Sequence, residues 1–128
     1  MKEQFELKAT FPVKPAVIYN AWLDSAEHSK MTGGEAICSN IIGASFTAWD
    51  GYISGTNQFL IENERIVQTW RTTEFGETDE DSELTLAFAE VPNGCKLTLT
   101  HTNIPEGQSN YKQGWEDHYF TPMRAYFK

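Results

Sequence analysis

The stretch SNYKQGWEDHYFTPMRAYFK, residues 109–128, decides how the rest of the chain must fold. Large side chains recur in it at steps of four, four, four and three residues: Tyr111, Trp115, Tyr119, Met123 and Tyr126. This spacing places them on one face of an α-helix. At about 1.5 Å per residue, about 18 residues make a helix about 27 Å long, and no other predicted element reaches that length.

The two ends of this helix differ in their signals. Ser109 or Asn110 can cap its N-terminus, because short polar side chains accept hydrogen bonds from free backbone N–H groups. Pro122 lies inside the pattern and has no N–H to donate, so it removes one helical hydrogen bond. We therefore expect a kink near this proline.

The N-terminal third predicts one strand followed by two short helices. Residues 5–11 alternate apolar and polar side chains, which is typical of a half-buried strand. Pro15 suits the first position of a helix that runs to about Trp22. Ser25 is a good cap for a second short helix, which ends near Met31 at the two glycines that follow Thr32.

The middle of the chain predicts consecutive antiparallel strands. Asp50-Gly51 and Pro92-Asn93-Gly94 are tight hairpin signals, and Gly55 predicts a bulge inside its strand. The expected strands lie at residues 36–40, 45–49, 52–61, 65–74, 83–91 and 95–103. Together with residues 5–11 they predict an α+β fold, a curved antiparallel sheet of about seven strands around the C-terminal helix. A helix across a curved sheet can leave a cavity, which Trp and Tyr side chains would line.

Length and charge exclude several classes of function. The chain has 128 residues and no internal repeat, which predicts one domain over residues 1–128. Its 10 basic and 18 acidic residues give a net charge of −8, which argues against binding nucleic acid or anionic lipid. No window approaches 18 uninterrupted apolar residues, and no secretory signal is evident, so we expect a cytoplasmic protein with no membrane span.

No catalytic constellation can be recognised. His101 is in register with Leu97 and Leu99, so it should point inward, where it acts either as a core histidine or as an acid–base group. His28 lies on a short polar helix and should face solvent, and His118 should flank the long helix. No nucleophile–histidine motif accompanies them, so we expect no enzyme and no catalytic residue.

Metal and cofactor signals are equally absent. Five acidic residues lie between positions 77 and 83, but they lack the glycine and the distal glutamate of a calcium loop. No glycine-rich phosphate loop follows a strand, and the isolated cysteines Cys38 and Cys95 have no zinc-ligand spacing. We therefore expect no metal, no cofactor and two reduced thiols.

The aromatic side chains allow two interpretations. The four tryptophans are large enough to dominate a packed core, and the same residues on a concave face could line a pocket for a small hydrophobic ligand. The candidate cavity residues are Trp49, Trp70, Phe88, His101, Trp115 and Tyr119.

Four stretches of the sequence carry a family resemblance that spans nearly the whole chain. The first is VIYNAWLD at residues 17–24 with His28 and Met31-Thr32-Gly33, and the second is FTAWDGYISG at residues 46–55. The third is Leu60 with RIVQTWR at residues 65–71, and the fourth is QGWEDHYF at residues 113–120, running on to Phe127. Together they resemble the family of the heat-shock-protein-90 ATPase activator, in the helix-grip superfamily of the START and birch-pollen-allergen folds.

The resemblance implies a seven-stranded helix-grip fold with an internal hydrophobic cavity. It points to the activator's C-terminal domain, while the N-terminal domain, which contributes much of the ATPase stimulation, has no counterpart here. The leading hypothesis is thus a non-enzymatic domain that associates with a heat-shock-protein-90-type chaperone. The alternative is a carrier or sensor of a small hydrophobic ligand, and an enzyme of the cyclase or hydrolase kind ranks third.

Overall fold

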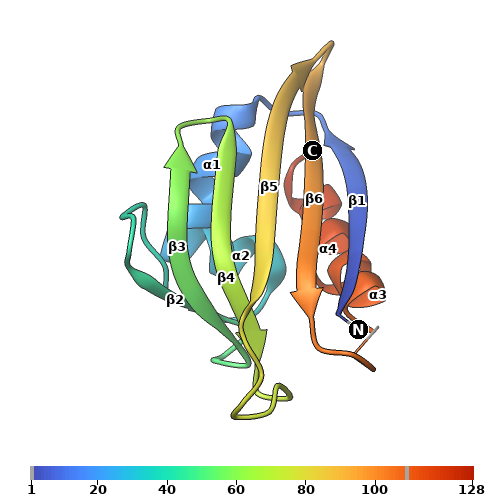
Figure 1. Cartoon of the computed structure of the whole chain (residues 1–128). Coiled ribbons are helices and arrows are strands. Elements are labelled where there is room, and N and C mark those ends of the chain that lie inside the picture. Colours follow the sequence, from blue (N-terminus) through green and yellow to red (C-terminus); the bar gives the residue numbers. More distant parts are fainter. Residues whose placement is uncertain (1, 109) are drawn as a thin grey trace.

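One antiparallel sheet carries three groups of helices on a single face. The computed structural model describes residues 2–108 and 110–128 (Figure 1). The six strands stand in the order β1-β6-β5-β4-β3-β2. Their bounds are β1 Glu3–Phe11, β2 Ser45–Ala48, β3 Ile53–Ile61, β4 Arg65–Thr72, β5 Ser82–Val91 and β6 Gly94–Ile104. The helices are α1 Pro15–Leu23, α2 Ser25–Thr32, α3 Tyr111–Trp115, η1 Glu116–Phe120 and α4 Thr121–Tyr126.

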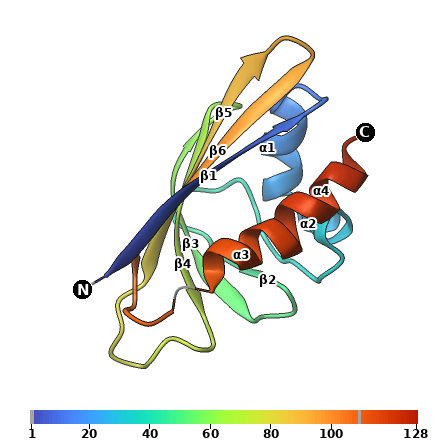
Figure 2. The ribbon, with the colours of Figure 1, turned by 90° about the vertical axis from the view of Figure 1, so that its right-hand side faces the viewer.

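The C-terminal helix is the element that the sheet curves around. Figure 2 shows α3 and α4 as one continuous rod, with α1 and α2 beside it on the same face of the sheet. Inward side chains of β5 and β6, such as Leu86 and Leu99, are fully buried beneath these helices. The α+β class and the helix across a curved sheet are therefore confirmed.

The predicted seventh strand at residues 36–40 does not form. Only Ile37 pairs in strand fashion, in an isolated bridge to Thr47. The reason lies in α2, where Ser29 accepts the N–H of Ala36 and Ser25 accepts the N–H of Cys38, both at 2.9 Å. These serines take backbone donors that a strand would have used, so the segment follows α2 instead of extending the sheet.

Three local predictions at turns and caps have different outcomes. Both hairpin turns are confirmed, since β2 and β3 join through Asp50-Gly51 and Val91 pairs directly with Gly94. The cap of α2 is Asp24, which accepts the N–H of Glu27 at 2.9 Å, and not Ser25. Ser109, one of the two capping residues predicted for the last helix, lies outside the described residues, and Asn110 makes no side-chain capping bond.

The predicted bulge at Gly55 is also corrected. The register of β3 against β4 shifts between Asn57 and Phe59, two residues later. Gly55 is needed for a different reason, because a Cβ atom there would lie 1.9 Å from the carbonyl oxygen of Thr69. The glycine therefore permits a close backbone approach between neighbouring strands.

Candidate functional site

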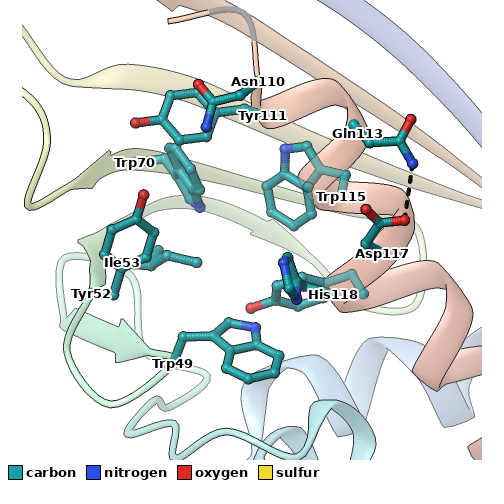
Figure 3. A pocket seen from close by; sticks show the side chains of 12 residues that line it. Trp49, Tyr52, Ile53, Trp70, Asn110, Tyr111, Gln113, Trp115, Asp117 and His118 are labelled. Carbon is teal, nitrogen blue, oxygen red and sulfur yellow. Dashed lines mark hydrogen bonds between the residues drawn. The ribbon is translucent and has the colours of Figure 1, made fainter.

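A pocket of about 580 Å³ lies between the C-terminal helix and the strands β3 and β4 (Figure 3). Its volume falls in the range of about 300–1,000 Å³ that is typical of small-molecule sites. Most of its wall is aromatic, with polar side chains gathered on the helix. The lining residues are Trp49, Tyr52, Ile53, Trp70, Asn110, Tyr111, Gln113, Gly114, Trp115, Asp117, His118 and Tyr119.

The helix wall of the pocket contains a π-helical turn. The N–H of Thr121 bonds to the carbonyl of Glu116, five residues back, and η1 covers residues 116–120. Pro122 follows at once and has no N–H of its own, so the regular α-helical ladder is interrupted here. The sequence predicted a lost hydrogen bond and a kink near Pro122; the structure shows a π-helical turn just before it, in a helix that continues as one rod (Figure 2). On this stretch of the helix Trp115 and Tyr119 are buried and line the pocket, while His118 is exposed at its rim.

Four of the six predicted cavity residues line this pocket: Trp49, Trp70, Trp115 and Tyr119. The other two do not. Phe88 is buried under α1, where its ring meets that of Tyr19 edge-on at 5.9 Å between centroids. His101 has no exposed surface, because the indole of Trp115 stands in front of it.

His101 instead joins the sheet to the helix through two hydrogen bonds. Ser82 donates its hydroxyl to the carbonyl of Trp70 at 2.6 Å, so its oxygen receives the Nε2 proton of His101 at 2.8 Å. Nδ1 of His101 then accepts the indole N–H of Trp115 at 3.0 Å. Burial lowers the pKa of His101 to about 3, and the imidazole is neutral. The prediction that it points inward is confirmed.

His28 is the functional-site neighbour that the sequence prediction placed wrongly. It is 3% exposed instead of facing solvent, because α2 turns it under the C-terminal helix. Its Nδ1–H donates to the carbonyl of Trp22, and its Nε2 accepts the hydroxyl of Tyr119, both at 2.8 Å. Burial lowers the pKa of His28 and raises that of Tyr119. His28 lies three and four residues before Met31 and Thr32, which are both buried, and this helical spacing was the signal in the sequence that could have predicted its burial.

Among the described residues, one buried indole N–H at the pocket has no hydrogen-bond partner. The Nε1 atom of Trp49 is buried and unpaired, beside the ring of His118 at 5.5 Å between centroids. The other polar groups are mostly paired, since Tyr111 bonds Gln108 and Thr72, and Tyr52 bonds Glu74.

The charges around the pocket are sparse and mostly negative. No lysine or arginine is among its lining residues, and Asp117 accepts a hydrogen bond from Gln113 at 2.9 Å. The acidic run at residues 77–83 lies elsewhere, where Asp81 pairs with Arg71 and Asp79 accepts the N–H of Gly76. Within residues 2–108 and 110–128, no three side chains of metal-binding type come together.

The described part of the chain also holds no helix both long and apolar enough to cross a membrane.

Comparison with known proteins places this chain in a family. The model of the family "Activator of Hsp90 ATPase homolog 1-like protein" matches residues 12–128. A crystal structure of an HSP90 activator from Plasmodium falciparum superimposes with a TM-score of 0.88 at 28% identity, covering 96% of this chain and 94% of that one. The chain thus belongs to the family of Activator of Hsp90 ATPase homolog 1-like proteins.

Two curated proteins show the same relationship over part of their length. An Activator of 90 kDa heat shock protein ATPase homolog of Dictyostelium discoideum is 28% identical over 113 residues, which are 87% of this chain and 29% of that protein. An uncharacterized protein of Schizosaccharomyces pombe is 26% identical over 119 residues, 92% of this chain and 35% of that protein. The chain spans about a third of the length of the curated relatives it matches.

Proposed function

We propose that this member of the Activator of Hsp90 ATPase homolog 1-like family is a non-enzymatic cytoplasmic domain that binds a heat-shock-protein-90-type chaperone. The observation that carries the proposal is the likeness to the Plasmodium falciparum HSP90 activator, which extends over 94% of that chain. Because the two curated relatives are about three times longer, we propose binding for this domain and leave strong ATPase stimulation to longer proteins.

The surface of strand β3 supplies an apolar contact region for such a partner. Four large apolar side chains there are between 49% and 66% exposed: Ile41, Ile42, Phe59 and Ile61, which we call the β3 surface. Phe59 and Ile61 flank Leu60, which packs against the core, so they project from the opposite face of the sheet. The loop with Ile41 and Ile42 is held to β3 by Asn57, whose amide donates to the carbonyl of Ile41 at 3.1 Å. Exposed apolar groups gathered in this way are typical of protein-binding surfaces.

Charge sets the expected salt dependence of this association. With a net charge of −8, the domain attracts a basic surface on its partner, and salt screens that attraction. The test is retention of a purified heat-shock-protein-90-type chaperone on the immobilised chain at low and at high salt, together with the ATPase rate of the mixture. We expect retention that weakens with salt and a small rise in ATPase rate. Absence of retention at low salt would overturn the proposal.

The aromatic pocket supports a second function, the binding of a small hydrophobic molecule. The pocket has the volume of a ligand site, and its walls combine Trp49, Trp70, Trp115 and Tyr119 with few charges. Titration with a panel of hydrophobic aromatic compounds, followed by the indole signals of Trp70 and Trp115, tests this function. Shifts confined to outer-surface residues would count against it.

A further inference from the structure

We propose that the free edge of strand β1 pairs with the same edge of a second copy of this chain, so that the two sheets join into one. This pairing depends neither on chaperone binding nor on the pocket, because the β3 surface lies toward the other end of the sheet. Three observations support it: an open backbone edge, a charge pattern that is complementary to itself in one register, and apolar side chains that this register brings together.

The open backbone edge is the first observation. β1 is nine residues long and stands last in the sheet, with β6 as its only neighbour among the described strands (Figure 1). Because alternate residues of an edge strand turn their N–H and C=O groups away from the neighbouring strand, about half of these groups in β1 face outward. Within residues 2–108 and 110–128, no backbone group of another element bonds to them. β1 contains neither proline nor glycine, so a further strand can pair along its length.

The charge pattern is the second observation. Glu6 and Lys8 project from the exposed face of β1, with side chains that are 54% and 55% exposed. Two antiparallel copies of the strand can pair about Leu7, and this register sets Glu6 of each copy opposite Lys8 of the other. A shift by two residues, the smallest that keeps the faces of the sheet, sets Glu6 opposite Glu6 or Lys8 opposite Lys8. Electrostatics therefore favour the register about Leu7 over both of its neighbours.

The apolar side chains are the third observation. Phe5 and Leu7 lie on the face of β1 that packs against the core, and both are only partly buried at this border of the sheet. In the register about Leu7, the two Leu7 side chains lie opposite each other, and Phe5 lies opposite Ala9 of the other copy. The pairing thus continues the core of each copy into the next. A two-fold axis through the joint makes the contact self-complementary, so association closes at a dimer.

The experiment reverses the two charges one at a time. Sedimentation equilibrium is run at about 0.15 M salt, which largely screens the repulsion between two chains of net charge −8. The wild-type chain should shift toward twice its monomer mass as its concentration rises. Glu6→Lys places a like charge opposite Lys8, and Lys8→Glu places a like charge opposite Glu6. Each variant alone should therefore self-associate about tenfold or more weakly than the wild type.

A mixture of the two variants restores opposite charges at both pairs, so it should dimerise about as tightly as the wild type. Glu83→Lys is the matched control and should associate as the wild type does. Glu83 is also exposed, and the variant changes the net charge as Glu6→Lys does, but Glu83 lies on β5, which is paired on both sides.

Amide exchange of the wild-type chain locates the contact and decides even where a charge variant fails to fold. Exchange in residues 5–9 should slow as the protein concentration rises, whereas exchange in β2, at the opposite border of the sheet, should not change. A wild-type chain that stays monomeric at millimolar concentration would overturn the proposal. So would charge variants that associate as tightly as the wild type, or slowed amides that lie outside β1.

Discussion

Trp115 donates its indole N–H to Nδ1 of His101 across 3.0 Å, and this bond ties the C-terminal helix to strand β6. Both side chains are buried, and Ser82 holds the far nitrogen of the imidazole at 2.8 Å. The bond therefore fixes the helix wall of the pocket against the sheet. It also links the stability of the fold to the shape of the pocket.

Replacing His101 with Leu should lower the free energy of unfolding by about 1–3 kcal/mol, because the buried N–H of Trp115 loses its acceptor. Urea unfolding at neutral pH measures the loss. Trp115→Phe and the double variant complete a cycle, in which the double variant should lose less than the sum of the two single losses. Strictly additive losses would show that the two residues do not stabilise each other.

Stability should fall as the solution is acidified below about pH 6.5. Burial lowers the pKa of His101 to about 3 from 6.5, and burial is also the main cause that lowers the pKa of His28. Protonation thus favours the unfolded chain, so the stabilisation is complete above pH 6.5 and is lost as the pH falls toward 3. Each histidine can contribute a slope of up to about 1.4 kcal/mol per pH unit.

Urea unfolding at a series of pH values between neutral and acid measures this slope. The variant His101→Gln lacks the imidazole and should show a shallower decline than the wild type. Equal slopes in the two proteins would mean that His101 does not titrate on unfolding.

Two glycines should respond to alanine in opposite directions. Gly55→Ala places a methyl group 1.9 Å from the carbonyl oxygen of Thr69, so it should destabilise by about 3 kcal/mol or more. Gly114→Ala meets nothing within 4 Å and lies in a helix, so it should stabilise by about 0.5–1 kcal/mol. Thermal unfolding of both variants checks the pair. A stable Gly55→Ala variant would contradict the close strand approach.

Arg71 should hold the loop between β4 and β5. Its guanidinium donates to the carboxylate of Asp81 at 2.8 Å and to the carbonyls of Gly76 and Asp79, and it lies over the ring of Phe75. Because the group is partly exposed, Arg71→Lys should cost only about 1 kcal/mol overall. Amide exchange in residues 74–81 should nevertheless quicken. Unchanged exchange there would assign the loop's order to Phe75 alone.

The sequence predicted the elements whose pattern is local and strong. The spacing from Tyr111 to Met123 identified the long helix, and the Pro92-Asn93-Gly94 turn identified the hairpin of β5 and β6. The segment at residues 36–40 was predicted wrongly as a strand, because its backbone partners are serines of α2 that no local pattern reveals.

The sequence predicted only part of the pocket, because strand and helix periods set the place of some of its residues and tertiary packing sets the place of others. Trp70 on β4 and Trp115 and Tyr119 on the C-terminal helix lie on the two faces that the periodicity brought together. Trp49 instead reaches the pocket from the turn after β2, where its backbone is left-handed with a φ of 52°. Phe88 shares the inward face of its strand with Leu84 and Leu86, but its place along the strand puts it under α1. The burial of His28 depends on how α2 packs against the C-terminal helix, which strand and helix periods do not specify.

Binding to a heat-shock-protein-90-type chaperone is tested most directly by titration calorimetry at low salt. The wild-type chain should bind the chaperone, and this binding should weaken as salt is added. The double variant Phe59→Ser/Ile61→Ser should bind at least about tenfold more weakly than the wild type. Val17→Ser is the matched control, since Val17 is similarly exposed at 46% but lies on α1, and it should bind as the wild type does. A wild-type chain that gives no binding heat and no complex at low salt would contradict the account.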